Sequence, residues 1–265
     1  PNIIQITDLI QGGADAPTFL VMELLDGYTL REVLEQERRL SPKRAAEIGA
    51  AIADAMAAAH RVGVIHRDLN PDNIFMCVGA GPEVKVLDFG IAHLCGSRAS
   101  SELPCGTPLY ISPEQAGADG FDERSDIYSL GALLYEAVAG RPVFDYDGVR
   151  DLFVAHVAES PTPLELPTGP AAALEAVIMA CLAKSADERP LSMQMIASHL
   201  SNIVEGWSTW SLDHDVGLAP MLDDDEFARR LDELWTDEQS PEEIVVEHSR
   251  ALPLEPRGQR DTLTD

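Results

Sequence analysis

The chain has 265 residues, of which 45% are hydrophobic, so it is long and apolar enough to bury a globular core. Its formal net charge of −26 disfavours a nucleic-acid partner, because an acidic surface repels a phosphate backbone. The four cysteines follow neither metal-site spacing nor a disulfide framework, and no apolar run is long enough to cross a bilayer. We therefore expect a cytoplasmic protein with no nucleic-acid partner and no membrane segment in this chain.

The first residues are typical of a β-hairpin followed by a helix. Residues 3–8 and 19–24 are apolar runs that predict two strands, with Gly12 and Gly13 in the turn between them. This glycine pair lacks the spacing of a phosphate-binding loop, so a turn is the better interpretation. Residues 29–36 predict a short helix.

The next two elements have clear boundaries. Ser41 predicts a helix N-cap, Pro42 fits the first helical position, and the helix is predicted to end near Gly63. Its apolar positions recur at helical spacing on one face, at Ile48, Ile52, Ala55, Met56 and Ala59. Residues 74–78 and 84–87 then flank a Gly-Ala-Gly-Pro turn and predict a second hairpin.

The following stretch is predicted to be a loop and then a series of helices. Residues 88–114 lack periodicity and contain Gly, Ser and Pro, which favours a loop. Residues 123–139 predict a long apolar helix that Gly140 ends. Three further helices are predicted near residues 148–158, 171–182 and 192–204.

Beyond residue 205 the composition is typical of a disordered tail. Residues 206–265 contain sixteen acidic residues and five arginines, with few residues able to form a core. Residues 226–235 could form a short amphipathic helix. A docking segment and a transient helix in a linker are both open interpretations of it.

The most specific pattern is His66-Arg67-Asp68-Leu69-Asn70-Pro71-Asp72-Asn73, followed by Asp88-Phe89-Gly90. Asp68 lies five residues before Asn73, and Asp88 follows the second predicted hairpin. Phosphoryl transfer needs an oriented nucleophile and cations held against phosphate oxygens. A base and two metal ligands in this order supply those parts.

Further motifs follow in a fixed order. They are Gly106-Thr107-Pro108-Leu109-Tyr110-Ile111-Ser112-Pro113-Glu114, Asp126-Ile127-Tyr128-Ser129-Leu130-Gly131, Cys181-Leu182-Ala183-Lys184 and Glu188-Arg189-Pro190. Together with the pattern above, they resemble a bacterial serine/threonine protein kinase of the eukaryotic type over residues 1–204. Ser112 stands where that family usually has Ala.

The resemblance implies an α+β, protein-kinase-like fold in three parts. Residues 1–25 would be a remnant of the N-terminal lobe with the hinge, residues 26–204 the mostly helical C-terminal lobe, and residues 205–265 an acidic tail. The family's glycine-rich loop and ATP-binding Lys are expected upstream of Pro1, since no Lys occurs before Lys43. An N-terminally truncated chain of this kind is expected to be inactive by itself.

The resemblance also implies the cofactors ATP and Mg²⁺ and assigns the central residues. Asp68 would be the general base, while Asn73 and Asp88 would bind Mg²⁺. Asn70 stands where most of these kinases carry a Lys that contacts the transferred phosphoryl group. We assign Asn70 a catalytic role with weaker electrostatic stabilisation, because an amide brings no charge.

The ATP-binding residues implied by the resemblance lie around the hinge. Met22 would guard the back of the pocket, backbone groups of Glu23 and Leu25 would bind the adenine edge, and Phe75 would lie under the adenine ring. By pattern alone, all four residues also fit an ordinary core or strand.

An activation segment is implied as well. Arg67 would pair with a phosphorylated residue of this segment, for which Ser97, Ser100 and Ser101 are candidates. Thr107 would line the pocket of the substrate hydroxyl. The alternative, that the three serines only solvate a loop, stays open.

Structural roles are implied for six residues, which are His66, Phe89, Gly90, Glu114, Asp126 and Arg189. His66 would stack beneath Phe89 of the metal-binding loop. Asp126 would accept hydrogen bonds from the backbone of the catalytic loop. Glu114 and Arg189 would form a buried ion pair.

The sequence therefore predicts a kinase that acts on Ser or Thr hydroxyls of proteins. A pseudokinase or protein-docking module is the alternative, which Asn70 and the acidic tail favour. A small-molecule phosphotransferase is disfavoured, because that class lacks the Ser-Pro-Glu segment and the helix of Asp126. The protein substrate and the oligomeric state stay open.

Overall fold

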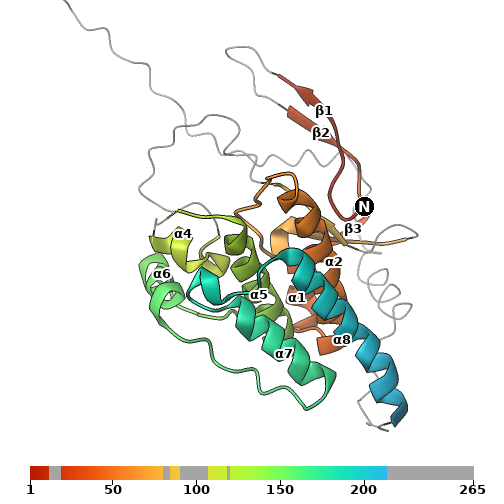
Figure 1. Ribbon diagram of the computed structural model, residues 1–265. Helices are drawn as coiled ribbons and strands as arrows, with labels where there is room; N and C mark the ends of the chain where they lie inside the picture. The colour runs from red at the N-terminus through yellow and green to blue at the C-terminus, as the bar shows by residue number, and fades with distance from the viewer. Residues whose placement is uncertain (12–18, 80–83, 90–106, 118–119, 214–265) are drawn as a thin grey trace, which may run out of the picture. The chain divides into compact units, whose positions relative to one another are not determined.

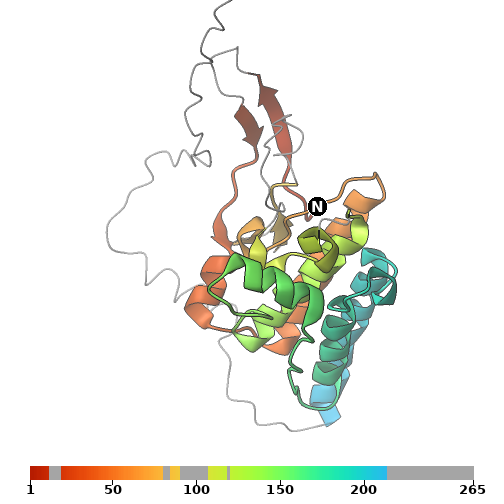
Figure 2. The same cartoon turned by 90° about the vertical axis from the view of Figure 1, so that its left-hand side faces the viewer.

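The computed structural model describes residues 1–11, 19–79, 84–89, 107–117 and 120–213, with side chains up to residue 208. This part of the chain is mostly helical, with two small antiparallel sheets (Figures 1 and 2). It belongs to one compact unit, Pro1–Met221. The second unit, Leu222–Asp265, lies outside the described residues, as does the predicted helix over residues 226–235.

The first sheet is the predicted N-terminal hairpin. Strands β1 (Ile6–Ile10) and β2 (Phe19–Met22) pair antiparallel, shifted by a few residues from the predicted ranges. Hydrogen bonds from the Ile4 amide to the Val86 carbonyl (3.0 Å) and from the Val86 amide to the Asn2 carbonyl (2.9 Å) attach the chain before β1 to the second sheet.

The second sheet has the order β3-β4-β5, with β3 (Gly27–Thr29), β4 (Ile74–Cys77) and β5 (Val84–Val86). The β4–β5 hairpin was predicted, but β3 was not, because three residues carry no readable periodicity. Gly27 has φ of 145°, and a Cβ there would lie 2.0 Å from the Met76 carbonyl oxygen. Only glycine therefore allows β3 to approach β4 this closely.

Helix α1 (Leu30–Glu37) starts directly after β3 with a capping box. The Thr29 hydroxyl accepts from the Glu32 amide, and the Glu32 carboxylate accepts from the Thr29 amide at 2.7 Å. These reciprocal bonds satisfy amides that a helix start leaves without partners.

The helical core consists of α2 (Pro42–His60), α5 (Glu123–Ala139), α7 (Pro170–Cys181) and α8 (Met193–Asp213). α8 packs along α2, and α7 packs on α5 (Figures 1 and 2). A Cβ at Gly131 would lie 2.7 Å from the Cys181 Cβ, so the absent side chain sets the α5–α7 distance.

Helix boundaries agree with the predicted caps where local signals exist. The Ser41 hydroxyl accepts from the Arg44 amide at 3.2 Å, and Gly140 ends α5 with φ of 69°. The last helix differs, because α8 continues to Asp213 instead of ending near residue 204. Ile203 and Trp207 lie four residues apart and extend the apolar period past the predicted boundary.

Five shorter elements complete the described chain. They are the helices α4 (Pro113–Gly117) and α6 (Val149–Ala158) and the 3-10 turns η1 (Pro71–Asn73) and η2 (Pro108–Tyr110), with a third turn at Ala186–Glu188. α4 packs against α6, and η2 packs against α5. The C-terminal end of the predicted loop 88–114 is therefore ordered by contacts with helices.

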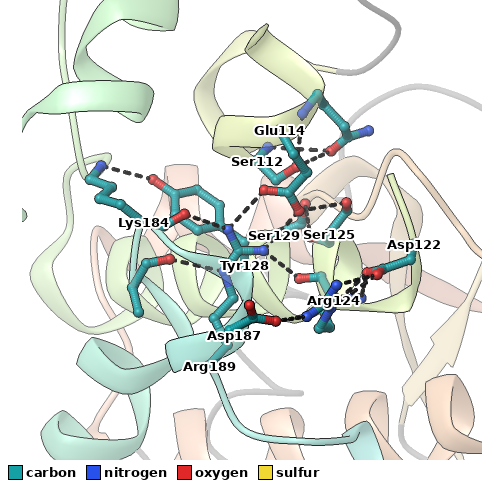
Figure 3. A network of polar contacts seen from close by, with 12 residues as sticks. Ser112, Glu114, Asp122, Arg124, Ser125, Tyr128, Ser129, Lys184, Asp187 and Arg189 are labelled. Atoms are coloured by element: carbon teal, nitrogen blue, oxygen red, sulfur yellow. Dashed lines mark hydrogen bonds and ion pairs between the residues drawn. The ribbon is translucent and has the colours of Figure 1, made fainter. Parts of the chain in front are cut away.

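Arg189 is the centre of a polar network that joins α4, α5 and the chain after α7 (Figure 3). Its fully buried guanidinium binds both carboxylate oxygens of Glu114 at 2.8 Å. It also donates to the carbonyls of Arg124 (2.8 Å), Ala183 (2.9 Å) and Lys184 (3.1 Å). The predicted Glu114–Arg189 ion pair is thus present.

Glu114 is kept ionised by this network. Burial alone would raise the pKa of Glu114, but hydrogen bonds from Arg189 and Ser125 outweigh it and hold this pKa below its usual value of 4.5. A bidentate pair of this kind fixes geometry as well as charge.

We predict that Arg189→Met destabilises the protein by about 3–5 kcal/mol, because it leaves the Glu114 carboxylate and three carbonyls without their donor. The free energy of urea unfolding measures this loss. Arg150→Met, at an exposed position of α6, is the matched control. A loss for Arg189→Met no larger than that of the control would contradict the prediction.

His156 on α6 is a buried titratable group. Its Nδ1 lies 2.9 Å from the Tyr128 hydroxyl, and its ring packs edge-on against Phe144 at 5.1 Å. Burial, together with the nearby Lys184 ammonium, lowers the pKa of His156 to about 4 from 6.5. The folded protein therefore keeps this ring neutral where the unfolded chain would protonate it.

This difference predicts a loss of stability at acidic pH. Between pH 6.5 and about 4 the unfolded state binds a proton at His156 that the folded state does not, so stability falls as pH falls through this window. His156→Gln should remove this part of the pH dependence, on the order of 2 kcal/mol between about pH 7 and 5. Urea unfolding at both pH values measures it, with exposed His199→Gln as the control. Equal pH dependence in wild type and His156→Gln would refute this assignment.

Candidate active site

The segment of residues 66–73 is held by the carboxylate of Asp126. This residue belongs to α5, and its side chain is almost completely buried. This carboxylate accepts from the amides of His66 (2.9 Å) and Arg67 (2.8 Å), and His60 Nε2 lies 2.7 Å from it. Arg67 has φ of 73°, a left-handed conformation that costs free energy for a residue with a side chain. The buried carboxylate thus fixes a strained turn directly before Asp68.

His66 connects this turn to the end of β5. Its Nε2 lies 2.8 Å from the Leu87 carbonyl, which can only accept, so Nε2 carries the proton. Its ring lies 4.9 Å from the Phe89 ring, centroid to centroid, with the two planes tilted by 49°, so the predicted contact is present without parallel stacking. Gly90, the next residue of the motif, lies outside the described part of the chain.

Asp68 and Thr107 are brought together from segments 39 residues apart. Asp68 Oδ1 accepts from the Thr107 amide (2.8 Å) and from the Thr107 hydroxyl (2.9 Å). The side-chain nitrogen of Asn73, Nδ2, donates to the Asp68 carbonyl at 2.8 Å and lies 3.5 Å from Asp68 Oδ2. Thr107 therefore holds Oδ1 of Asp68 with two hydrogen bonds, whereas Oδ2 has only the long contact with the Asn73 side chain among the described residues.

Asn73 and Asp88 lie on neighbouring backbone segments. The Leu87 amide donates to the Asn73 carbonyl at 2.9 Å, which extends the β4–β5 pairing to the residue before Asp88. Asp88 has φ of 46° and is exposed. The side-chain nitrogen of Asn73 is bound to the Asp68 carbonyl, so the oxygen Oδ1 is the end of this carboxamide that is not used in that bond.

These two side chains fit a hard divalent cation. Both offer oxygen, which Mg²⁺ and similar ions prefer, and such ions keep several water or phosphate ligands. The described residues contain no cluster of three or more His, Cys, Asp or Glu side chains that could hold a metal.

The four residues predicted to bind adenine do not all keep their backbone groups available. Met22 ends β2, and the Glu23 amide donates to the Gln5 carbonyl at 3.0 Å, so only the Glu23 carbonyl is left for a nucleotide. Leu25 and Phe75 are half-buried, Phe75 within β4. This narrows the predicted contribution of Glu23 to its carbonyl.

Sequence reasoning missed Lys85, which joins the end of β2 to β5. Lys85 is buried, pairs with Phe75 across the sheet and forms an ion pair with the Glu23 carboxylate. The hydrogen bond from Lys85 lowers the pKa of Glu23. The one available signal was a Lys between Val84 and Val86 in an otherwise apolar strand.

A second missed group surrounds Arg31 of α1. Its guanidinium binds Glu136 of α5 at 3.0 Å and the Tyr110 hydroxyl of η2, and its Nε lies 3.4 Å from Asp72 of η1. The Tyr110 hydroxyl also bonds to Glu136, and burial followed by this carboxylate raises the pKa of Tyr110. Four elements around Asp68 are thereby linked by one cation.

Arg67 carries the side chain predicted to bind a phosphorylated segment. Its guanidinium lies 4.4 Å above the Phe121 ring, and its buried Nε has no hydrogen-bond partner among the residues that the structure describes. The candidate serines, Ser97, Ser100 and Ser101, lie outside those residues, so this pairing stays a prediction.

Comparison with known proteins identifies the family. Residues 1–200 match the model of the protein kinase domain. Serine/threonine-protein kinase PknB of Mycobacterium tuberculosis is 40% identical over 198 residues, which are 71% of this chain and 31% of the relative. PkaA of Streptomyces coelicolor is 36% identical over 222 residues (83% and 40%), and pkn2 of Myxococcus xanthus is 38% identical over 210 residues (76% and 25%).

The chain spans about a third of the length of the PknB relatives that it matches. Within the described ranges, no helix combines the length and the apolar character needed to cross a membrane. Membership of this family implies the use of ATP as substrate and of a divalent metal ion. From the family match and the identities to these relatives, the chain belongs to the protein kinase family, among the bacterial serine/threonine kinases of the eukaryotic type.

Proposed function

We propose that the full-length protein transfers the γ-phosphoryl group of Mg·ATP to Ser or Thr hydroxyls of protein substrates. The observation that carries this proposal is the arrangement of Asp68. Thr107 binds one carboxylate oxygen through two hydrogen bonds, and Oδ2 is left to accept a hydroxyl proton. A base fixed in this way can orient an incoming alcohol, which is most of what this reaction needs.

The proposed step assigns one atom of each residue. Asp68 Oδ2 accepts a hydrogen bond from the substrate hydroxyl and takes its proton as the new O–P bond forms and the bond from phosphorus to the ADP oxygen breaks. Thr107 keeps Asp68 in place through its amide and hydroxyl. The carbonyl of Glu23, the backbone of Leu25 and the ring of Phe75 would hold the adenine.

The oxygens of Asn73 and Asp88 would hold Mg²⁺. When bound, this ion neutralises charge on the β- and γ-phosphates. Asn73 is pre-oriented for this role, since its nitrogen is bound to the Asp68 carbonyl. We also propose a reducing, cytoplasmic location for this domain, which the free thiols of Cys77 and Cys181 support.

A pseudokinase or docking module is the second candidate. The observation that favours it is Asn70, which is uncharged where most of these kinases carry Lys. A protein of this kind would bind partners without transferring phosphate. Assays of the full-length protein with Mg·ATP separate the two proposals.

We expect Asp68→Asn to lower kcat about 10²–10⁴-fold while ATP affinity stays the same, because the amide cannot take the proton. Phosphate transfer to a Ser/Thr peptide measures the rate, and calorimetric titration measures ATP binding. Asp54→Asn, on the exposed face of α2, is the control. Unchanged transfer by Asp68→Asn would reject the base. Absence of transfer by the wild-type protein would favour the docking module.

We expect Arg67→Ala to abolish the gain in activity that follows autophosphorylation. The substitution removes the guanidinium, whose buried Nε has no partner among the described residues, and the phosphorylated residue would then lose its cation. The ratio of kcat before and after incubation with Mg·ATP measures this gain. Arg61→Ala, at the exposed end of α2, should keep the full gain. The same gain in Arg67→Ala as in wild type is the outcome that rules out this pairing.

A further inference from the structure

Asn70 is one of the few buried polar residues of the described chain, and its carboxamide makes four hydrogen bonds. Its Oδ1 accepts from the amides of Asp72 (2.9 Å) and Asn73 (3.3 Å). Its Nδ2 donates to the Asp68 carbonyl and to the Thr107 hydroxyl, both at 3.0 Å. A carboxamide has two N–H donors and two acceptor directions, so every one of them is used.

The direction of these bonds is fixed by the backbone. Two amide N–H groups require an oxygen, so the end of Asn70 that faces η1 is Oδ1 and the other end is the NH₂ group. The Thr107 hydroxyl accepts from this NH₂ group and has one proton, which it donates to Asp68 Oδ1 at 2.9 Å. The result is a chain of hydrogen bonds from Asn70 through Thr107 to Asp68, in which each bond polarises the next.

Asn70 also begins the turn that carries Asn73. It is the N-cap of η1, in an extended conformation (φ −152°, ψ 168°), with Pro71 in the first position. Its oxygen thereby accepts a hydrogen bond from the backbone N–H of Asn73, and the side chain of Asn73 in turn donates to the Asp68 carbonyl. The same carboxamide contacts Asp68, Thr107 and the backbone of Asn73.

We propose that Asn70 is a positioning residue that orients Asp68 and Asn73, and that it does not bind the transferred phosphoryl group. This inference rests on the proposed function, and it replaces the catalytic role predicted for Asn70 from the sequence. Only 3% of Asn70 is exposed, and no N–H remains for a ligand. The uncharged side chain of Asn70 therefore contributes by holding Asp68 and Thr107 in place.

A double-mutant cycle on kcat tests this inference in the full-length protein. Asn70→Ser keeps an oxygen to cap η1 but is too short to reach Thr107, and Thr107→Val removes only the hydroxyl. We expect each change to lower kcat about tenfold, and the double variant to lose about the same tenfold, because both break one chain of bonds. The KM for ATP should change less than about twofold.

The opposite outcome is equally clear. If Asn70 contacts the phosphoryl group directly, the two losses are independent and the double variant loses about a hundredfold, which overturns the inference. Asn202→Ala, at an exposed position of α8, controls for the loss of an ordinary Asn side chain and should keep the wild-type kcat.

The same four proteins also give a readout that needs no activity. Urea unfolding of wild type, both single variants and the double variant should show coupling, because the lost Asn70–Thr107 bond is counted once in the double variant. If the loss of unfolding free energy in the double variant equals the sum of the losses in the two single variants, the inference is overturned, even if the kinase is active. Coupled unfolding with no phosphate transfer by the wild type would reject the proposed function and leave the hydrogen-bond chain in place.

Discussion

The buried carboxylate of Asp126 is the interaction on which the candidate site depends. A charge inside a helix core is costly, and here two backbone amides and His60 offset that cost. Because Arg67 adopts a left-handed conformation, the turn before Asp68 would relax without these bonds. The positions of Asp68, of the Asn73 side chain bound to its carbonyl and of the Thr107 contact follow from this turn, so a buried residue of α5 sets the geometry of the candidate site.

Helix α5 provides this anchor and a second one. Asp126 and Glu136 lie ten residues apart on it, or about 15 Å along the axis. Asp126 holds the segment before Asp68, and Glu136 holds η2 and α1 through Tyr110 and Arg31. Glu114 reaches the start of the same helix through Ser125, at 2.7 Å, and through its pair with Arg189. One rigid element therefore sets the spacing between the segments that meet at Asp68.

The sequence allowed prediction wherever the signal was local or belonged to a recognised motif. Ser41 and Gly140 bound their helices through chemistry within one turn, and the Glu114–Arg189 pair followed from ordered motifs. The β3 strand was too short to show a period, and the Lys85–Glu23 and Arg31–Glu136 pairs join residues 62 and 105 positions apart. The residues next to Lys85 or Arg31 in the sequence do not indicate which distant carboxylate each one binds, so these pairs are recognised only in the three-dimensional structure.

The contact between Gly131 and Cys181 has an evolutionary consequence. A single methyl group at position 131 would overlap the Cβ of Cys181, and Cys181 is itself completely buried. A side chain at position 131 therefore requires a glycine at position 181 or a separation of α5 from α7, and a larger residue at position 181 cannot be answered by a smaller one at position 131, which is already glycine. Selection on position 131 is consequently predicted to keep glycine, because any other residue would move the helix that carries Asp126.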